Sequence, residues 1–337
     1  MRLPAEWEYR SAILVSLPHA DTDWNYMLDD ILSCYKNMVD ALSGYHPVIV
    51  VSPDTELAKE HIWTNASVHF FRADTNDTWI RDYGPITLVA DNGEYSVMDF
   101  RFNGWGLKFA SCFDNMVTNH MAESSLITVP VRCCQDFVLE GGGIESDGRG
   151  SLMTTASCQL SPNRNPVKSR EEITEYLKTS FGANQVLWLN HGWLSGDDTD
   201  GHIDTLARFF HNDTIVYTGC GDPYDEHYEE LCLMKREIEM FRKPDGSAFN
   251  LVELPLPDPV FDESGMRLPA TYCNFLITDK AMFLPVYNQQ YKDHLAIEIC
   301  RSISPVPVVP VDCSALIQQH GSLHCATMQV PRNILSI

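Results

Sequence analysis

A cysteine near the C-terminus of this chain lies among small and polar residues. The segment 321–329 reads GSLHCATMQ, with Cys325 at its centre and Gly321 and His324 close by. Any single cysteine among the eleven in the chain is more often structural than catalytic. A core cysteine, however, usually sits in an apolar run, whereas a reactive thiolate needs a polar and partly accessible setting. Taken alone, Cys325 is a weak candidate nucleophile.

The segment 197–204, DDTDGHID, concentrates four carboxylates and one imidazole. A solvated loop is the simplest interpretation. A metal site is a second, but the regular ligand spacing and closing Glu of a calcium loop are absent. If a strand begins at His202, then His202 and Asp204 point to the same face, because side chains alternate along a strand. That face would carry a proton shuttle beside an anion.

Two further segments place charged residues at strand ends. Residues 76–85 join two strand-like runs and carry Arg81 and Asp82, which could form a structural pair or serve a site, since loops often carry function. Residues 138–145 put Glu140 at the end of an apolar strand against three glycines, which allow close backbone approach. The spacing and the Lys of dinucleotide and Walker loops are missing. Both segments are therefore candidate site loops of another kind.

Together the four segments offer a thiol, an imidazole and three carboxylates, an inventory that suits a guanidinium group. A guanidinium is planar and permanently charged, so Asp82 and Asp204 could hold it by charge-assisted hydrogen bonds on two edges. Its central carbon is a poor electrophile, and Cys325 could attack it to form an amidino-cysteine intermediate that divides hydrolysis into two steps. One imidazole, His202 oriented by Glu140, could protonate the departing ammonia and then deprotonate the incoming water.

The elements that must position these residues repeat along the chain. Five helical patterns can be read, at 24–42, 109–121, 169–181, 225–241 and 291–303. Each is followed by an apolar run of β character, at 47–51, 126–131, 185–189, 249–254 and 307–311. In the first helix the apolar residues recur at three- and four-residue steps, which predicts one buried face, and Ser169 and Glu172 have the spacing of a capping box.

This repetition leaves two arrangements open. A doubly wound α/β sheet gives the same alternation as five modules arranged around an axis. Polar segments follow four of the strand-like runs, however, and around an axis these segments would meet at one end. The radial arrangement therefore predicts a single central pocket.

Composition excludes several classes of protein. The chain has 337 residues, which leaves one or two domains open, and its net charge of -22 argues against nucleic acid as a partner while favouring a cationic substrate. Residues 1–17 fit neither a signal peptide nor a membrane span, so we expect a cytoplasmic protein without a membrane partner. The cysteines form no Cys-x-x-Cys pair, so most should be buried reduced thiols.

Several ordered motifs resemble the agmatine deiminase and bacterial (Porphyromonas-type) peptidylarginine deiminase family of the guanidino-group-modifying (pentein) superfamily. The resemblance spans nearly the whole chain and rests on segments that follow one another in the family's order: LPAEWE at 3–8, NDTWIRDYGP at 76–85, NGWG at 103–106, LEGGGI at 139–144, GHID at 201–204, HC at 324–325 and QVP at 329–331.

The resemblance implies a five-bladed pseudo-symmetric α/β propeller, the pentein fold, with residues 1–337 as a single domain. It also implies that Asp82 and Asp204 grip the guanidinium, that Glu140 and His202 serve polarisation and proton transfer, and that Cys325 attacks. Trp79 would line the substrate channel. No metal and no organic cofactor are expected, and a homo-oligomer is an option that the sequence leaves open.

The resemblance implies a small cationic guanidino substrate, with agmatine foremost. The segment before His324 and the presence of Thr205 depart from the better-known agmatine deiminases and are closer to a compact bacterial branch, so peptidylarginine or free arginine is the alternative substrate. Arginine would need a cation for its carboxylate, and the motif segments offer only Arg81 and the neighbourhood of Lys108 against many acids. An ammonium suits an acidic funnel with aromatic rings such as Trp79 better.

Two other classes remain as alternatives. The superfamily includes a ribosome-binding factor on the same propeller, but such a protein should lack the combined set of site residues. A glycosidase would explain paired carboxylates but leaves Cys325 and His202 without a role.

Overall fold

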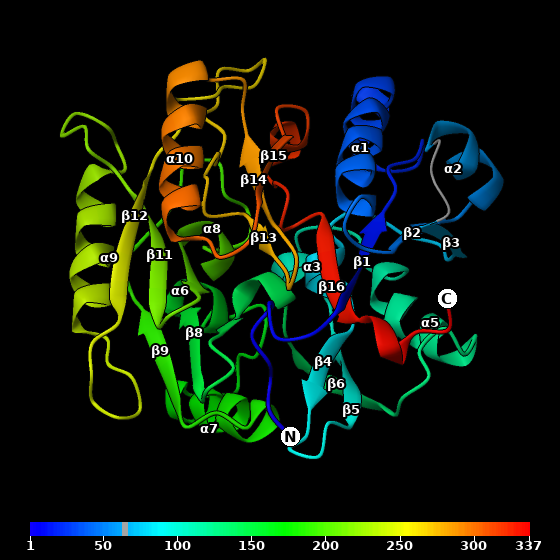
Figure 1. Cartoon of the computed structure of the whole chain (residues 1–337), viewed down its shortest axis with the longest axis horizontal. Helices are drawn as coiled ribbons and strands as arrows, with labels where there is room; N and C mark the ends of the chain where they lie inside the picture. Colours follow the sequence, from blue (N-terminus) through cyan, green and yellow to red (C-terminus); the bar gives the residue numbers. More distant parts are fainter. Residues whose placement is uncertain (63–66) are drawn as a thin grey trace.

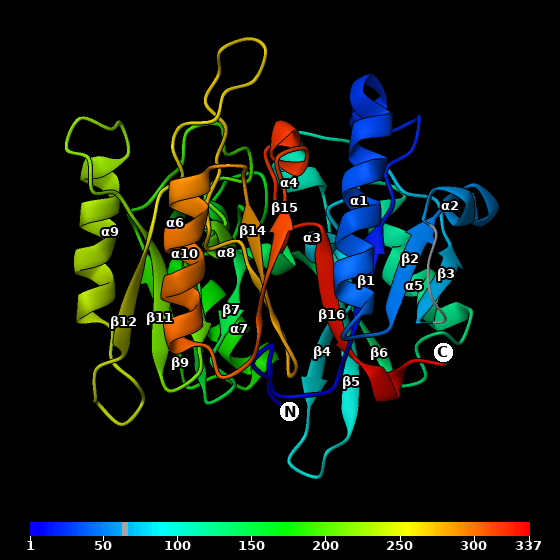
Figure 2. The same cartoon turned by 45° about the horizontal axis from the view of Figure 1, so that its top comes forward.

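Five small sheets follow one another along the chain, each built mainly from consecutive strands. The computed structural model describes residues 1–62 and 67–337. Helices α1, α5, α7, α9 and α10 lie at the periphery of the molecule, and the short helices α3 and α8 lie near its centre (Figure 1). The same ring of outer helices is visible after rotation (Figure 2). The predicted five-module propeller is confirmed, and a single doubly wound sheet is excluded.

The first sheet combines both ends of the chain, in the order β16 (Thr327–Pro331), β1 (Ser11–Ser16), β2 (Val48–Ser52) and β3 (Val68–Arg72). The second contains β4 (Ile86–Val89), β5 (Tyr95–Arg101) and β6 (Val131–Val138). The third contains β7 (Glu145–Ser146), β8 (Ser151–Thr155) and β9 (Gln185–Leu189). The fourth contains β10 (Ala207–Phe210), β11 (Thr214–Gly219) and β12 (Asn250–Pro255). The fifth contains β13 (Leu276–Ile277), β14 (Met282–Val286) and β15 (Val308–Asp312).

Every sheet has the same pairing. A central strand pairs antiparallel with one neighbour and parallel with the next. Parallel neighbours need a crossover connection. In the five modules the crossovers contain α1 (Leu28–Ser43), α5 (Val117–Glu123), α7 (Arg170–Phe181), α9 (Tyr228–Met240) and α10 (Gln290–Ile303).

Shorter helices occupy the connections. They are α2 (Thr55–His61), α3 (Ile80–Tyr83), α4 (Gly104–Leu107), α6 (Ala156–Gln159) and α8 (Ile203–Leu206). Single 3-10 turns are η1 (Asp23–Met27), η2 (Asp114–Met116), η3 (Gly141–Gly143), η4 (Leu316–Gln319) and η5 (Arg332–Ile334).

The pairing of β16 with β1 closes the ring. The register runs from Ser11 opposite Pro331 to Val15 opposite Thr327, so the C-terminal strand completes the first module. The two strands lie side by side in both views (Figures 1 and 2). Because β16 begins at Thr327, this closure fixes the position of Cys325, two residues earlier.

Most predicted elements are confirmed within a few residues. The predicted face of the first helix is buried at Trp24, Ile31, Tyr35, Met38, Val39 and Leu42, whereas Leu28 is half-buried. Trp24 lies in the 3-10 turn before α1, which begins at Leu28. Ser169 and Glu172 form the capping box, with the Ser169 side chain accepting from the Glu172 N–H and the Glu172 side chain accepting from the Ser169 N–H. The predicted helix 109–121 is shorter, since α5 begins at Val117.

One predicted strand is wrong. Residues 126–131 are apolar, but the strand that pairs with β5 is β6, which begins at Val131 opposite Val97. Ile127 instead forms an isolated bridge with Leu335 and packs in the core. The polar composition of VRCCQDFV concealed the true strand, because only Cys134, Phe137 and Val138 among its residues are buried.

The second correction concerns residues 202–204. They do not begin a strand: Asp200 and Gly201 have φ of 68° and 83°, and this left-handed turn leads into α8, with His202 as the residue before the helix. His202 and Asp204 therefore reach the site from a helical turn, and strand alternation is not the reason.

Two remaining expectations can be compared with the structure. Within residues 1–62 and 67–337, no helix combines the length and the apolar character that a membrane span requires. All eleven cysteines lie within these residues as free thiols, and most are buried.

Candidate active site

A pocket lies where three of the four polar segments meet, namely 76–85, 197–204 and 321–329. Its most buried walls carry five of the predicted site residues: Trp79, Asp82, His202, Asp204 and Cys325. Its more exposed walls carry acids, namely Asp23, Asp77, Asp197 and Asp198, together with Gln319 and His320. Trp105 and Phe109 add aromatic surface. The sixth predicted residue, Glu140, lies behind His202 and is fully buried.

Asp82 is the first of two buried carboxylates in the pocket. It lies in α3, where the Trp105 indole N–H donates to Oδ2 at 2.9 Å and the Gly142 N–H donates to Oδ1 at 2.9 Å. Trp105 makes this contact from a left-handed backbone conformation, with φ of 53°, which is strained for a residue with a side chain. Burial raises the pKa of Asp82 to about 6, with His202 opposing and Asp204 adding to the rise.

Asp204, on α8, is the second buried carboxylate. His324 Nδ1 lies 2.7 Å from Oδ2, while Oδ1 has no hydrogen-bond partner among the described residues. Burial alone would raise the pKa of Asp204, but the hydrogen bond and charge of His324, with His202 and Arg208, lower it below its ordinary value. One ionised oxygen atom is therefore left without a donor in a buried position.

Cys325 lies directly beside Asp204. The Asn274 side-chain N–H donates to Sγ at 3.2 Å, and Sγ lies 3.8 Å from Asp204 Oδ2. Burial, followed by the charges of Asp204 and Asp82, raises the pKa of this thiol well above its ordinary value. In the free protein the thiol is protonated at neutral pH, because two anions disfavour a third.

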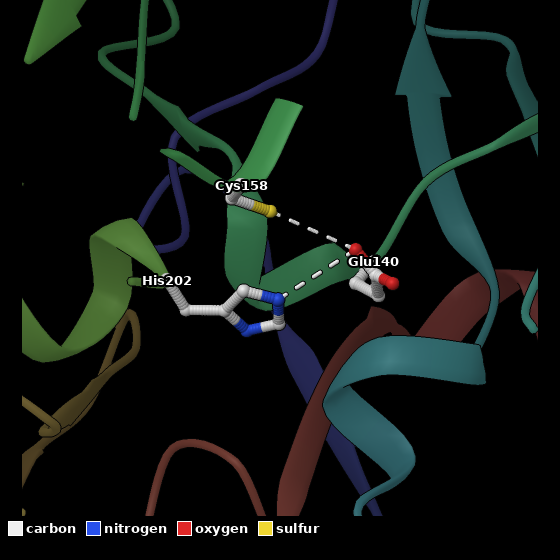
Figure 3. Close-up of side chains that lie close together, drawn as sticks. All are labelled: Glu140, Cys158 and His202. Carbon is white, nitrogen blue, oxygen red and sulfur yellow. Dashed lines mark hydrogen bonds and ion pairs between the residues drawn. The ribbon is translucent and has the colours of Figure 1, made fainter. Parts of the chain in front are cut away.

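His202 and Glu140 form an acid-base pair behind the carboxylates (Figure 3). His202 Nδ1 lies 3.6 Å from Asp82 Oδ1, and Nε2 lies 3.6 Å from Glu140 Oε2. Burial opposes a charge on the ring, but Asp82, then Cys158 and Glu140, raise the pKa of His202 well above its ordinary value. Arg164 Nε lies 2.8 Å from Glu140 Oε2, so Glu140 has its own counter-ion. His202 is consequently placed to carry a proton at neutral pH.

A family model described as Porphyromonas-type peptidyl-arginine deiminase matches residues 2–331 of the chain. The chain belongs to this family. A solved structure of a candidate arginine deiminase from Porphyromonas gingivalis is 43% identical, with 99% of each chain covered and a TM-score of 0.93. A cysteine-to-serine variant of C. jejuni agmatine deiminase, solved with substrate bound, is 37% identical over 98% of this chain and 96% of that chain, with a TM-score of 0.91. A curated relative, a candidate agmatine deiminase from Legionella pneumophila, is 28% identical over 98% of this chain and 95% of its own length.

A second thiol, that of Cys158, is an alternative candidate for the nucleophile of this deiminase family member. Cys158, on α6, is fully buried and its Sγ lies 3.8 Å from Glu140 Oε2, pointing at that carboxylate (Figure 3). It does not belong to the pocket wall, whereas Cys325 does. A nucleophile must reach the substrate carbon, so the geometry favours Cys325.

Glu140, Cys158 and His202 are also the group, within the described residues, whose ligand atoms lie close enough to hold a metal ion, all within 4.8 Å of one another. Arg164 Nε, however, lies 3.0 Å and 2.8 Å from the two oxygen atoms of Glu140. A metal ion there would face a guanidinium cation across the same carboxylate. The donor set therefore fits an acid-base cluster held by ion pairs better than a metal site.

Several residues at this site carried no usable sequence signal. Asn274, which contacts the Cys325 sulfur, lies between core residues, and Arg164 lies in an ordinary polar turn. Trp105 was part of a recognised motif, but nothing in the motif indicated its contact with Asp82. Arg81 forms no pair with Asp82; its guanidinium faces Gln329 and Glu6 instead.

Substitution of Gly142 tests how closely the site side chains pack. A Cβ atom there would lie 2.7 Å from His202 Nδ1, 2.8 Å from Asp82 Oδ1 and 3.0 Å from Asp204 Oδ2. We expect Gly142→Ala to displace these side chains and to lower hydrolysis of a guanidinium substrate by about 10²-fold, since misplacement of about 1 Å has that effect. The measurement is kcat/KM together with thermal unfolding.

Gly221→Ala is the matched control, because a Cβ atom there meets nothing within 4 Å. A Gly142→Ala variant as active as Gly221→Ala would contradict the proposed crowding of the three side chains.

The protonation of Cys325 gives a second prediction. Because its pKa is raised, the rate of alkylation by neutral iodoacetamide should increase only above pH 9, and Asp204→Asn should move this increase to lower pH by removing an adjacent anion. Peptide mass spectrometry reports the modified residue, with exposed Cys112 as an internal reference for the reagent. Rapid alkylation of Cys325 at pH 7 in the wild type would show that the thiol is already ionised.

Proposed function

We propose that this protein hydrolyses the guanidinium group of agmatine, giving N-carbamoylputrescine and ammonia through a covalent intermediate on Cys325. The observation that carries the proposal is the convergence of a thiol, an imidazole and two buried carboxylates on one pocket with acidic outer walls. Each of these groups matches one requirement of guanidinium hydrolysis.

The two aspartates bind the guanidinium. Asp82 has both oxygens fixed by donors from the protein, and Asp204 presents an oxygen without a partner. A planar cation with five N–H donors placed between them supplies the missing hydrogen bonds. Its charge also offsets the cost of burying two anions in one cavity.

Substrate binding activates the thiol. The same two aspartates that raise the pKa of Cys325 are neutralised by the bound cation, so the pKa of the thiol falls and its proton leaves to solvent. The thiolate then attacks the central carbon of the guanidinium, which forms the C–S bond.

His202 moves protons in both halves of the reaction. As the tetrahedral adduct collapses, the C–N bond breaks and His202 donates a proton to the departing ammonia. The neutral imidazole then accepts a proton from water, whose oxygen attacks the amidino carbon. The C–S bond breaks as the hydroxyl proton of this second adduct leaves to solvent, which releases the neutral urea product and regenerates the thiolate. Glu140, held by Arg164, orients the ring and stabilises its charged form.

The outer walls of the pocket favour an ammonium over a carboxylate at the far end of the substrate. Burial raises the pKa of Asp198, with Asp197 adding to the rise and His320 opposing it, so a bound cation would stabilise its ionised form. Lys108 already contacts Asp200 at 2.8 Å and donates to the backbone carbonyl of Asp198 at 2.5 Å. Arg81 faces Glu6 and Gln329 and is not available to a carboxylate in this pocket.

Peptidylarginine is the second candidate substrate. The family description favours it, and a peptidyl arginine that is not C-terminal carries no free carboxylate at that residue. It would, however, place an uncharged peptide chain against the acidic outer walls, where agmatine places an ammonium.

A substrate panel tests this choice. We expect kcat/KM to be highest for agmatine, lower for a blocked arginyl peptide and lowest for free arginine, measured as ammonia release at one ionic strength. Asp198→Asn should raise KM for agmatine while changing the peptide value little, because only agmatine brings a cation to that wall. Asp91→Asn, an exposed aspartate outside the pocket, is the control. A higher value for arginine or the peptide would overturn the assignment to agmatine.

Matched substitutions distinguish the roles of the Cys325 and Cys158 thiols. We expect Cys325→Ser to abolish turnover and the covalent adduct seen by mass spectrometry of acid-quenched samples, since a hydroxyl is a far weaker nucleophile at this position. Cys158→Ser should keep the adduct on Cys325 and lower the rate only moderately, because it retains a donor toward Glu140. An adduct on Cys158, or turnover by Cys325→Ser, would reassign the nucleophile.

A further inference from the structure

A cluster of buried charged residues lies next to Asp204, outside the pocket wall. Its members, all less than 10% exposed, are Glu6, Arg81, Glu145, Arg208 and His324. None of them contacts the pocket in which the substrate is proposed to bind. The cluster therefore has no direct part in the chemistry described above, although it touches Asp204 through one residue.

That residue is His324, which lies between two carboxylates. Its Nδ1 is 2.7 Å from Asp204 Oδ2, and its Nε2 is 2.7 Å from Glu6 Oε1. Ionised carboxylates only accept hydrogen bonds, and a neutral imidazole has one N–H. For both contacts to be hydrogen bonds, the Asp204–His324–Glu6 unit must hold two protons, one in each contact.

Glu6 forms ion pairs with two arginines. Arg208 Nη2 lies 2.9 Å from its Oε2, and Arg81 Nη1 lies 3.3 Å from its Oε1. Arg208 is fixed in turn by Glu145, at 2.9 Å from Nε. Arg81 Nε also donates to the backbone carbonyl of His324 at 3.3 Å. The imidazole is thus anchored at its far nitrogen and at its backbone.

We propose that His324 is a positioning residue for Asp204: anchored by Glu6, it holds Oδ2 so that Oδ1 faces the pocket and can accept from the substrate guanidinium. The inference rests on the proposed function and extends it to a residue that does not touch the substrate. Without the Nδ1 contact, Asp204 could rotate toward the Cys325 thiol, which lies 3.8 Å from Oδ2, and the guanidinium would lose one of its two fixed acceptors.

The proposal gives the N-terminal segment a role at the active site. Glu6 and His324 are 318 residues apart in sequence. The segment around Glu6 is pinned by the Arg2 N–H to the Val89 carbonyl at 2.9 Å and by the Leu3 N–H to the Phe181 carbonyl at 3.0 Å. Glu6, near the N-terminus, therefore acts on Asp204 through His324, near the C-terminus.

Two amide substitutions separate the two nitrogens of His324. In His324→Asn the side-chain amide nitrogen can occupy the place of Nδ1 and donate to Asp204, whereas in His324→Gln it can occupy the place of Nε2 and donate to Glu6. We expect His324→Gln to lower kcat/KM for agmatine by about 10²-fold, as for other small misplacements of a binding group. His324→Asn should retain most of the activity.

The pH profile supplies a readout that a purely structural role would not change. The hydrogen bond from His324 is the first of the contributions that lower the pKa of Asp204. Burial, then Arg208 and Arg81, lower the pKa of His324 itself, so the hydrogen bond is the contribution that His324→Gln removes. The pKa of Asp204 then rises, and the acid limb of kcat/KM should move to higher pH in His324→Gln. The other charged or titratable groups facing Asp204 are His202, Asp82, Cys325 and Arg208, and both variants keep them. The difference between Gln and Asn therefore reports the Nδ1 contact.

Thermal unfolding of both variants, with exposed His294→Asn as control, checks that the fold is retained. Equal losses in the Asn and Gln variants, or an unchanged acid limb in His324→Gln, would overturn the proposal.

A second measurement needs no turnover and so separates failure of this inference from failure of the proposed function. In protein with ¹⁵N-labelled histidine, the His324 Nδ1–H resonance should lie far downfield, and it should shift upfield in Asp204→Asn, because a neutral acceptor makes a weaker hydrogen bond. Absence of ammonia release from every substrate in the wild type would overturn the proposed function alone. A His324 resonance that is insensitive to Asp204→Asn would overturn the positioning role whatever the activity.

Discussion

The two buried carboxylates of Asp82 and Asp204 are the constraint around which the site is built. Burying like charges in one cavity is costly, and among the described residues no lysine or arginine lines this pocket. The His202 imidazole, whose pKa is raised, offsets part of the charge of Asp82. The protein also supplies neutral donors to Asp82, from Trp105 and Gly142, and the imidazole of His324 to Asp204. What these donors leave unsatisfied is one oxygen atom and an excess of negative charge, and both complement a guanidinium cation.

The same constraint keeps the thiol unreactive until substrate arrives. Burial, followed by the charges of the two aspartates, raises the pKa of Cys325 before a cationic substrate binds. In the proposed mechanism a neutral electrophile entering the pocket meets a thiol, whereas a guanidinium brings the charge that generates the thiolate. Selectivity for cations therefore acts on the nucleophile as well as on binding, and it follows from electrostatics without any conformational change.

The sequence predicts the fold, and it predicts that Asp82, His202, Asp204 and Cys325 share one pocket, because both follow from local patterns and ordered motifs. Helix periodicity, the capping box at Ser169 and the apolar runs each reflect a few adjacent residues. The roles of these side chains in catalysis are part of the proposed function. Contacts between motifs are not local. Arg164 and Glu140 are 24 residues apart and Asn274 and Cys325 are 51 residues apart, so no pattern of adjacent residues indicates either contact.

The errors have the same origin. The sequence indicates His324 only as a polar neighbour of Cys325. In the structure its ring contacts Asp204 and Glu6. The alternation expected from His202 to Asp204 failed because Asp200 and Gly201 turn the chain into a helix. Strand β6 is not predicted because it forms by pairing with β5, and its own residues are not apolar enough to indicate a strand.

Ring closure links these observations. The antiparallel pairing of β1 with β16 brings the first and last segments of the chain to the centre of the molecule, where one end contributes Glu6 and the other His324 and Cys325. The charged cluster that orients Asp204 also needs Arg81 from the segment 76–85 and Arg208 from β10. No subset of modules contains all of these groups, so the geometry that binds a guanidinium arises only when the whole propeller has formed. A central site of this kind ties activity to completion of the fold more strictly than a site built from adjacent loops of a single module would.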